Sequence, residues 1–416
     1  MNDTTPALAY AARSQRLADV IALRKPDRVP AIFFAHYWPT RHCGLSNREA
    51  MFEPERAAAA MRQVIPDLAP DAYMPFSLNT GPQMELLDYR QVQWPGHKGL
   101  GDDLPFQNLD AEFMKAAEYD EYLTDPTGYF LKTYLPRVAG VYEPFRKLPD
   151  FPAQFYFGAV HLARVFADPE MIKALEVLAQ AGRQTLRVFQ LQGEAARDLA
   201  QLGFPTATGG FSAAPFDIVS DYFRGSKGAL LDMLRNREQL LAMIDRVLKI
   251  IPRGTIEMFR HMPAKTVFIP LHWCLDGFMS PKQFETFYWP SLRQLAITFI
   301  EAGITPCLFW EGDCTTRLEI IKDIPRGKCI YYFERTDLVK AKKVLGDTVC
   351  IRGGVPASLL VSGTPAAVAD HCKRLIDEVG HDGGLIVDAS VGIPDEARYE
   401  NVRAMFETTR EYGVYR

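Results

Sequence analysis

A histidine and a cysteine two positions apart are the first residues of this sequence whose types suggest chemistry. His272 and Cys274 follow an apolar run, and in extended chain a spacing of two places both side chains on one face. A catalytic zinc takes about three protein ligands, imidazole and thiolate among them, and keeps one position open. We therefore predict a zinc site of His272, Cys274 and Glu311, with Asp313 or Cys314 as other sources of the third ligand. Alternatively, His272 is a hydrogen-bonded histidine and Cys274 a passive neighbour.

Two carboxylates lie close together in the stretch FWEGD. Glu311 and Asp313 can act as acid and base if burial or mutual repulsion raises the pKa of one of them. We favour Glu311 as the catalytic member, because Cys307, Phe309 and Glu311 share a face by alternation. Asp313 is otherwise the cap of the helix that follows.

Other polar residues also follow apolar runs. Arg352 ends the run TVCIR before two glycines, where it either holds a carboxylate or phosphate or forms a structural salt bridge. Asp388 ends the last run of the chain. We predict catalytic roles for His272, Glu311 and Asp388, and substrate contacts from His36, Tyr37, Trp310, Asp313 and Arg352.

Short apolar runs alternate with helical segments in the last third of the chain, and they must position these residues. The runs are rich in β-branched and aromatic residues and too short for independent helices: 266–272, 305–311, 328–334, 348–352 and 384–388. The segments from Ser280 to Gly303 and from Thr364 to Gly380 carry helix start and stop signals. Strand followed by helix, repeated, predicts a parallel sheet whose functional residues lie beyond the carboxyl ends of the strands.

The remainder of the chain extends this pattern. Residues 11–25 and 53–64 are helical in composition, 29–34 and 71–76 are predicted strands, and 168–200 is a long helical stretch. Residues 81–155 are rich in Pro, Gly and Asp and are predicted to be an insertion. We therefore expect an α/β fold, a (β/α)8 TIM-type barrel formed by residues 1–416 as one domain, with this added segment.

Composition favours small-molecule chemistry. Of the 416 residues 48% are hydrophobic, and the net charge of −4 comes with spread lysines and arginines, which argues against a nucleic-acid or anionic-membrane surface. We expect a cytoplasmic protein, because the sequence has no apolar stretch long enough to span a bilayer and no signal-peptide pattern. The seven cysteines, an odd number without tight pairing, are expected to be reduced, with Cys307, Cys329 and Cys350 as core residues.

The C-terminal half resembles a known superfamily. The stretches PFDIVSDYFRGSKGALLDMLR, DGFMSPKQFETFYWPSLRQL, GGVPASLLVSGTPAAV and GGLIVDASVGIPDEARYENVRAM, with KPDRVP near the N-terminus, are similar to uroporphyrinogen decarboxylase-like proteins. This superfamily includes the true decarboxylases. It also includes methyltransferases, which work with corrinoid proteins and coenzyme M. The resemblance implies a (β/α)8 barrel with a ligand pocket at its C-terminal mouth, and a homodimer.

The sequence departs from both branches of the superfamily. Decarboxylases carry an arginine-rich N-terminal motif for the substrate's carboxylates, whereas AIFFAHYWPTRHCG offers only Arg41. Methyltransferases carry H-x-C-G at one strand end and a further cysteine before G-I-P. Those positions here are Phe309, Glu311 and Gly312, and Val391.

Three hypotheses follow. In the first, the protein moves a methyl group between a small methylated substrate and a thiol or a corrinoid held by a separate protein, with Glu311 and His272 acting on the leaving heteroatom. In the second, it is a metal-free decarboxylase or lyase of a carboxylated or tetrapyrrole substrate, in which Arg352 holds a carboxylate and His272 or Asp388 supplies a proton. In the third, it binds a tetrapyrrole or corrinoid without turnover.

Overall fold

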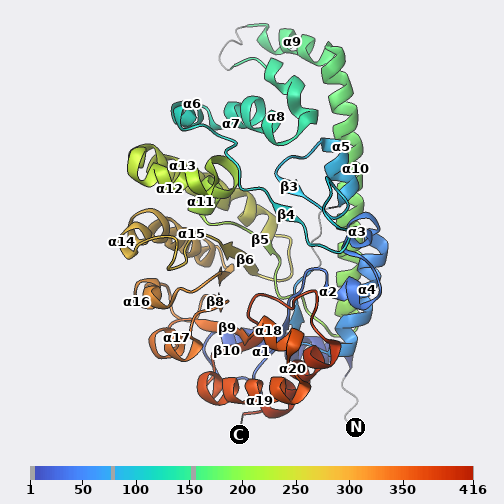
Figure 1. Ribbon diagram of the computed structural model, residues 1–416, viewed down its shortest axis with the longest axis vertical. Coiled ribbons are helices and arrows are strands. Elements are labelled where there is room, and N and C mark those ends of the chain that lie inside the picture. Colours follow the sequence, from blue (N-terminus) through green and yellow to red (C-terminus); the bar gives the residue numbers. More distant parts are fainter. Residues whose placement is uncertain (1–4, 76–79, 151–155, 416) are drawn as a thin grey trace.

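A six-stranded parallel sheet forms the centre of the protein in the computed structural model, which describes residues 5–75, 80–150 and 156–415 (Figure 1). The strand order is β10-β9-β8-β7-β6-β5, and each neighbouring pair is parallel. The strands are β5 (Gly210–Phe211), β6 (Thr266–Leu271), β7 (Thr305–Trp310), β8 (Ile330–Phe333), β9 (Cys350–Val355) and β10 (Leu385–Ala389). The predicted α/β class and parallel sheet are confirmed.

The sheet does not close into a continuous barrel. The strands predicted within 29–34 and 71–76 are β1 (Ile32–Phe33) and β2 (Ala72–Tyr73), which form a separate parallel pair. One parallel bridge, between Ala31 and Val387, links this pair region to β10, and another, between Tyr73 and Thr206, links it to the segment that precedes β5. Apart from a small antiparallel sheet at residues 92–93 and 107–108, the described strands therefore make a six-stranded sheet and a two-stranded parallel sheet.

Two strands continue beyond the predicted ends. β9 runs through Gly353 and Gly354 to Val355, with φ angles of 118° and 102° at the two glycines, a region that favours glycine. β10 runs one residue past Asp388. The expectation that Arg352 and Asp388 end their strands is therefore wrong, and both residues lie inside the sheet.

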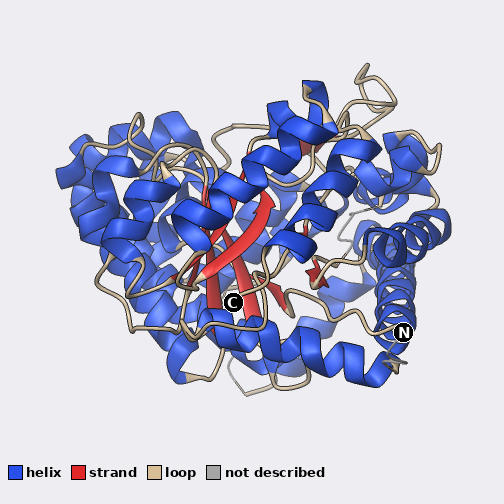
Figure 2. Cartoon of the chain, turned by 90° about the horizontal axis from the view of Figure 1, so that it is seen from below, coloured by secondary structure: helices blue, strands red, loops and turns tan. Residues whose placement is uncertain are grey.

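Helices surround the sheet (Figure 2). The longer ones are α1 (Pro6–Ile21), α4 (Pro54–Leu68), α10 (Pro169–Gln201), α12 (Gly225–Arg235), α13 (Arg237–Phe259), α15 (Trp289–Glu301), α17 (Leu338–Leu345), α19 (Pro365–Leu375) and α20 (Tyr399–Tyr412). Short helices are α2 (Trp38–His42), α3 (Asn47–Phe52), α11 (Pro215–Asp217), α14 (Pro281–Gln283), α16 (Leu318–Ile321) and α18 (Ala357–Ser362). The predicted helix starts are confirmed, because the hydroxyls of Ser280 and Thr364 accept the backbone N–H groups of Gln283 and Ala367. Within the described ranges, no helix is long and apolar enough to cross a membrane.

Residues 81–150 form a loop-rich segment with short elements, whose later helices lie at the end of the molecule opposite both termini (Figure 1). These are α5 (Gly81–Leu87), β3 (Val92–Gln93), β4 (Gln107–Asn108), α6 (Tyr119–Thr124), α7 (Pro126–Tyr129) and α8 (Leu135–Val138), and α9 (Gly158–Leu162) follows. Buried Asp232 of α12 anchors the segment, since it accepts a hydrogen bond from the Tyr119 hydroxyl at 2.7 Å. Residues 151–155 of the predicted insertion lie outside the described residues.

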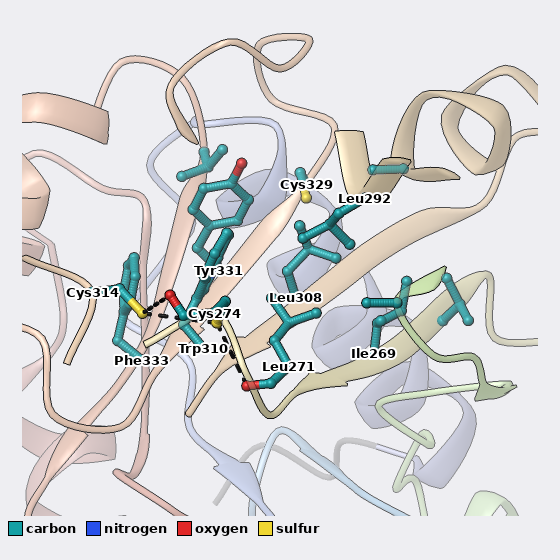
Figure 3. Close-up of a cluster of buried hydrophobic side chains, with 14 of the residues drawn as sticks. Ile269, Leu271, Cys274, Leu292, Leu308, Trp310, Cys314, Cys329, Tyr331 and Phe333 are labelled. Carbon is teal, nitrogen blue, oxygen red and sulfur yellow. Dashed lines mark hydrogen bonds between the residues drawn. The ribbon is translucent and has the colours of Figure 1, made fainter. Parts of the chain in front are cut away.

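Side chains on the two faces of the sheet enter different cores. Phe268, Phe309 and Tyr332 face the inside, together with Phe34 of the β1 segment. The alternate residues face the helices, where Trp310 is fully buried beside Leu308, Tyr331 and Phe333 (Figure 3). Trp310 is therefore a core residue, and the structure does not place it where a substrate would contact it. Cys307, Cys329 and Cys350 are buried, as predicted.

Candidate active site

A cavity of about 390 Å³ opens at the carboxyl ends of β6 and β7. Five phenylalanines form much of its wall: Phe34, Phe106, Phe211, Phe268 and Phe309. Its polar side chains include His36, Asn108, His272 and Glu311. Phe106 and Asn108 come from the loop-rich segment, which thus covers one side of the cavity. Among the described residues that line it, none is lysine or arginine.

A wider hollow of about 720 Å³ lies nearby, between α17, α18 and α19. It is lined by residues that include Glu334, Arg335 and Arg374, but neither His272 nor Glu311 is among the described residues that line it. We assign the chemistry to the smaller cavity, because that cavity brings together two ionisable groups whose pKa values are shifted.

His272 directly follows β6 and is held by an aspartate from a distant segment. Its Nδ1 lies 2.6 Å from Oδ2 of Asp221, and the indole N–H of Trp273 donates to the other oxygen of the same carboxylate. Asp221 lies on the π-helical stretch Ile218–Arg224, a kind of irregularity that is frequent at functional sites. Sequence reasoning missed Asp221, although the quoted stretch PFDIVSDYFRG contains it.

Glu311 approaches the other side of the same imidazole. Its Oε1 lies 3.7 Å from Nε2 of His272, and the side chain is about one third exposed. Cys307 and Phe309 face the inside of the sheet and Glu311 lines the cavity, so the alternation that favoured this residue is confirmed. His272 thus lies between two carboxylates.

The surroundings favour a charged imidazole. Burial by itself lowers the pKa of His272, whereas the hydrogen bond to Asp221 raises it. The negative charges of Asp217, Asp221 and Glu311 raise it further, and the resulting pKa is about 9. Burial raises the pKa of Glu311 to about 6 against the opposing charge of His272. At neutral pH the cavity therefore holds an imidazolium beside an ionised glutamate.

Asp217 supports this arrangement from a buried position next to His272. Its Oδ2 accepts the backbone N–H of His272 at 3.0 Å and the hydroxyl of Tyr288 at 2.7 Å. The carboxyl group is fully buried, and burial, with the charge of Asp221, raises its pKa to about 7. Asp217 fixes the position of the His272 backbone, and sequence reasoning missed this residue too.

Arg352 and Asp388 form a buried ion pair inside the sheet. The Nε and NH2 groups of Arg352 lie 2.8 and 2.7 Å from Oδ2 of Asp388, and the guanidinium carbon stacks 4.5 Å above the centre of the Tyr332 ring. Neither is among the described residues that line the cavity, although the cavity residue Phe34 has its ring centre 6.0 Å from the guanidinium. Burial raises the pKa of Asp388 to about 7 against the charge of Arg352. Of the two roles considered for Arg352, this geometry is that of a structural salt bridge.

Comparison with models of known protein families identifies the family of this chain. The family model described as "Uroporphyrinogen decarboxylase (URO-D)" matches residues 158–412. This protein is a member of the URO-D family. A uroporphyrinogen decarboxylase from Chlorobium phaeobacteroides is 25% identical over 134 residues, which cover 29% of this chain and 38% of that relative. One from Chlorobium phaeovibrioides is 23% identical over 133 residues, 29% of this chain and 37% of the relative.

These matches span less than two fifths of either curated relative. Among solved structures, a methyltransferase from Methanosarcina mazei superposes with a TM-score of 0.62 at 15% identity, covering 96% of this chain and 98% of that one. At that identity the likeness concerns the fold. The shared fold extends over nearly the whole chain.

In this URO-D family member, no arginine is found among the described residues that line the cavity. Arg41, the one arginine of the N-terminal region singled out from sequence, donates to the backbone oxygen of Asp103 at 2.9 Å. A cavity walled by phenylalanines suits an uncharged aromatic or aliphatic substrate better than a polycarboxylate.

The predicted zinc ligands do not come together as a group of three within the part of the chain that the structure describes. Cys274 is fully buried, with its sulfur 3.9 Å from that of Cys314 and 3.6 Å from the backbone oxygen of Leu271 (Figure 3). The chain bends after β6, so the period-two alternation that would align Cys274 with His272 ends there. Among the described residues, no group of three or more His, Cys, Asp or Glu side chains is placed to hold a metal ion. The donor set does not fit zinc, and we derive no step through a metal.

Of the other residues predicted to contact the substrate, only some line the cavity. His36 lines the cavity, whose walls desolvate it and lower its pKa. Tyr37 is buried, and its hydroxyl lies 3.1 Å from the sulfur of Met51, while the residue borders an adjoining hollow of about 350 Å³. Asp313 is exposed and accepts the N–H and hydroxyl of Thr315, but the N-cap of the helical turn Thr315–Arg317 is Cys314, so the prediction that Asp313 caps this turn is wrong.

Proposed function

We propose that this protein is a methyltransferase that takes a methyl group from a small methylated substrate and transfers it to a corrinoid on a separate protein or to a thiol. The observation that carries the proposal is the imidazolium of His272, held by Asp221 and facing Glu311 in an aromatic cavity. We also interpret the two sheets as a (β/α)8 barrel, as the family implies, in which single bridges complete the ring of strands.

His272 supplies the proton in this scheme. Since Asp221 occupies Nδ1, Nε2 is the nitrogen that faces the cavity. The bond between the methyl carbon and its heteroatom breaks, the heteroatom keeps the electron pair and takes the Nε2 proton, and the methyl group leaves as a cation equivalent. The acceptor provides the electron pair for the new bond to carbon. Proton donation of this kind contributes about 10² to 10⁴ in rate.

Glu311 restores the charged imidazole. Its pKa of about 6 leaves it ionised at neutral pH, and its oxygen lies 3.7 Å from Nε2. The proton that left on the product heteroatom is replaced by one from solvent after each turnover, and the negative charge of Glu311 favours this uptake by His272 and stabilises the imidazolium between turnovers. The phenylalanine walls exclude water and hold the apolar part of the substrate.

The acceptor is proposed to approach from the open side. The cavity shares His36, Phe106 and Val391 with the adjoining hollow of about 350 Å³, which extends to Glu396. A corrinoid bound by its own protein would meet the substrate at this side. When present, such a group supplies a strongly nucleophilic metal centre for the methyl group.

Decarboxylation is the second candidate, supported by the names of the family and of the curated relatives. Against it stand the lack of lysine or arginine among the described lining residues and the engagement of Arg352 by Asp388. A carboxylated substrate would enter this cavity without a cationic partner other than His272, which Asp221 and Glu311 already neutralise.

Methyl transfer is tested with the purified protein, reduced cobalamin and a panel of aryl methyl ethers, methylamines and methyl thioethers. We expect one class to yield demethylated product, detected by mass spectrometry. His272→Gln should abolish turnover, whereas His381→Gln, at an exposed position, should not. The outcome that contradicts the proposal is release of CO₂ from a carboxylated substrate by a protein that demethylates none of the panel.

A further inference from the structure

The phenylalanines of the cavity form a tilted and edge-to-face array. The ring centre of Phe34 lies 5.5 Å from that of Phe268 and 6.4 Å from that of Phe309, at interplanar angles of 59° and 87°. The ring of Phe211 meets that of Phe268 at 5.8 Å and 79°. Such an array offers both ring edges and ring faces, the partners that another aromatic ring prefers. The wall of the cavity therefore favours an aromatic ligand over an aliphatic one.

The imidazole of His36 extends the array to the loop-rich segment. Its centre lies 5.3 Å from that of Phe34 and 6.5 Å from that of Phe106, at angles of 62° and 84°. The cavity volume of about 390 Å³ is close to the lower end of the range of about 300–1,000 Å³ for ligand pockets. A pocket of this size suits a ligand with a single ring.

The charges of the site select against an anion. Asp221 and Glu311 together outweigh the charge of His272, and no lysine or arginine is found among the described lining residues. A methylated ammonium ion does not meet that obstacle. It has no use for the proton on His272, however, because its amine leaves without a charge.

The proton on His272 identifies the heteroatom that carries the methyl group. The pKa of His272 is about 9, whereas a thiol has a pKa of about 8.5 and a phenol one of about 10. A departing phenolate therefore takes the proton from the imidazolium, and a departing thiolate gains little from it. An aliphatic alkoxide also takes the proton, but the aromatic array selects against it. The methyl group is thus best placed on an oxygen bonded to an aromatic ring.

Asn108 supplies a further polar contact in the cavity. It lies on β4, and within the described part of the chain its side chain makes no hydrogen bond. An amide both donates and accepts, so it can pair with a hydroxyl group without any charge. A hydroxyl on the ligand's ring meets this need.

We propose that the substrate is a neutral methoxybenzene that carries a ring hydroxyl, with its methoxy oxygen at His272 and its hydroxyl at Asn108. The inference rests on the proposed function for the fate of the methoxy group. The bond between the methyl carbon and the oxygen breaks, and the oxygen keeps the electron pair and takes the Nε2 proton. The methyl carbon forms its new bond with an electron pair of the acceptor. The product is a benzenediol.

Calorimetric titration of the purified protein with the isomers of methoxyphenol tests the ligand class without turnover. We expect saturable binding of at least one isomer. The matching methoxycyclohexanol should bind about tenfold more weakly or less, because it loses several ring contacts. Methoxybenzoate and the trimethyl(phenyl)ammonium ion should also bind at least about tenfold more weakly.

Variants separate the hydrogen bond from the ring contacts. Asn108→Leu, at an exposed position, should weaken methoxyphenol binding up to about tenfold and leave methoxybenzene binding unchanged, since only the former has the hydroxyl. Phe211→Leu should weaken both ligands about two- to tenfold, because it removes one ring of the array. Phe189→Leu, which is exposed on α10, is the matched control and should alter neither.

Binding and turnover together distinguish this inference from the proposed function. Equal binding of methoxyphenol and methoxycyclohexanol, or tighter binding of the ammonium ion, overturns the inference, and demethylation of a methylamine would then leave methyl transfer intact. Selective binding of a methoxyphenol that is demethylated with neither reduced cobalamin nor a thiol supports the ligand class and contradicts the proposed function.

Discussion

Nδ1 of His272 and Oδ2 of Asp221 lie 2.6 Å apart, although 51 residues separate them in the chain. The contact fixes which imidazole nitrogen faces the cavity and contributes to the raised pKa of His272. A histidine without this partner would be largely neutral at pH 7. Asp221 is thus a positioning residue that gives His272 its charge.

Asp221→Asn should lower the pKa of His272 and reduce turnover about tenfold or more, with little change in KM, because the substrate contacts stay. The pKa is measured by NMR titration of the imidazole. Asp313→Asn, in an exposed turn, is the matched control and should leave the pKa unchanged. An unaltered imidazole pKa in Asp221→Asn would contradict this role.

The activity should have a bell-shaped dependence on pH. Glu311 must be ionised and His272 protonated, so the rate should rise through about pH 6 and fall through about pH 9. Glu311→Gln should remove the acidic limb and keep the alkaline one. The profile of kcat/KM checks both, and an acidic limb that persists in Glu311→Gln would assign it to another group.

Asp217 should make the protein less stable as pH rises. Its pKa is about 7 when folded and near 3.8 when unfolded, so between these values the unfolded state has released a proton that the folded state still holds. The contribution of Asp217 to stability therefore falls between about pH 4 and pH 7, by about 4 kcal/mol, and stays constant above. Urea unfolding at several pH values measures this.

Asp217→Asn should reduce the slope of that dependence, because the amide does not titrate, while Asp388, whose pKa is also raised, keeps its own contribution. Asp313→Asn again serves as a control and should keep the slope of the wild-type protein. Equal slopes for wild type and Asp217→Asn would show that other groups set the pH dependence.

Arg352→Met should destabilise the protein by about 3–5 kcal/mol, because it leaves Asp388 buried without a counter-charge. The double variant Arg352→Met with Asp388→Asn should lose less, since no charge is then buried alone. Denaturant midpoints check both. Preserved stability of Arg352→Met combined with a raised KM for a carboxylated substrate would instead support a binding role.

Local patterns identified much of the framework. The apolar runs became β6 to β10, and the hydroxyls of Ser280 and Thr364 cap the predicted helix starts. Alternation along β7 put Glu311 on one face with Cys307 and Phe309, and the structure shows the same grouping. These features depend on residues near one another in the chain, so the sequence by itself determined them.

Only the tertiary structure decided which residues meet. The π-helical stretch brings Asp221 to His272, and the register of β9 with β10 brings Arg352 to Asp388. The bend after β6 sends Cys274 into the core, away from the cavity. Pairing between distant segments depends on how whole strands and helices pack, and one sequence read locally contains no measure of that packing.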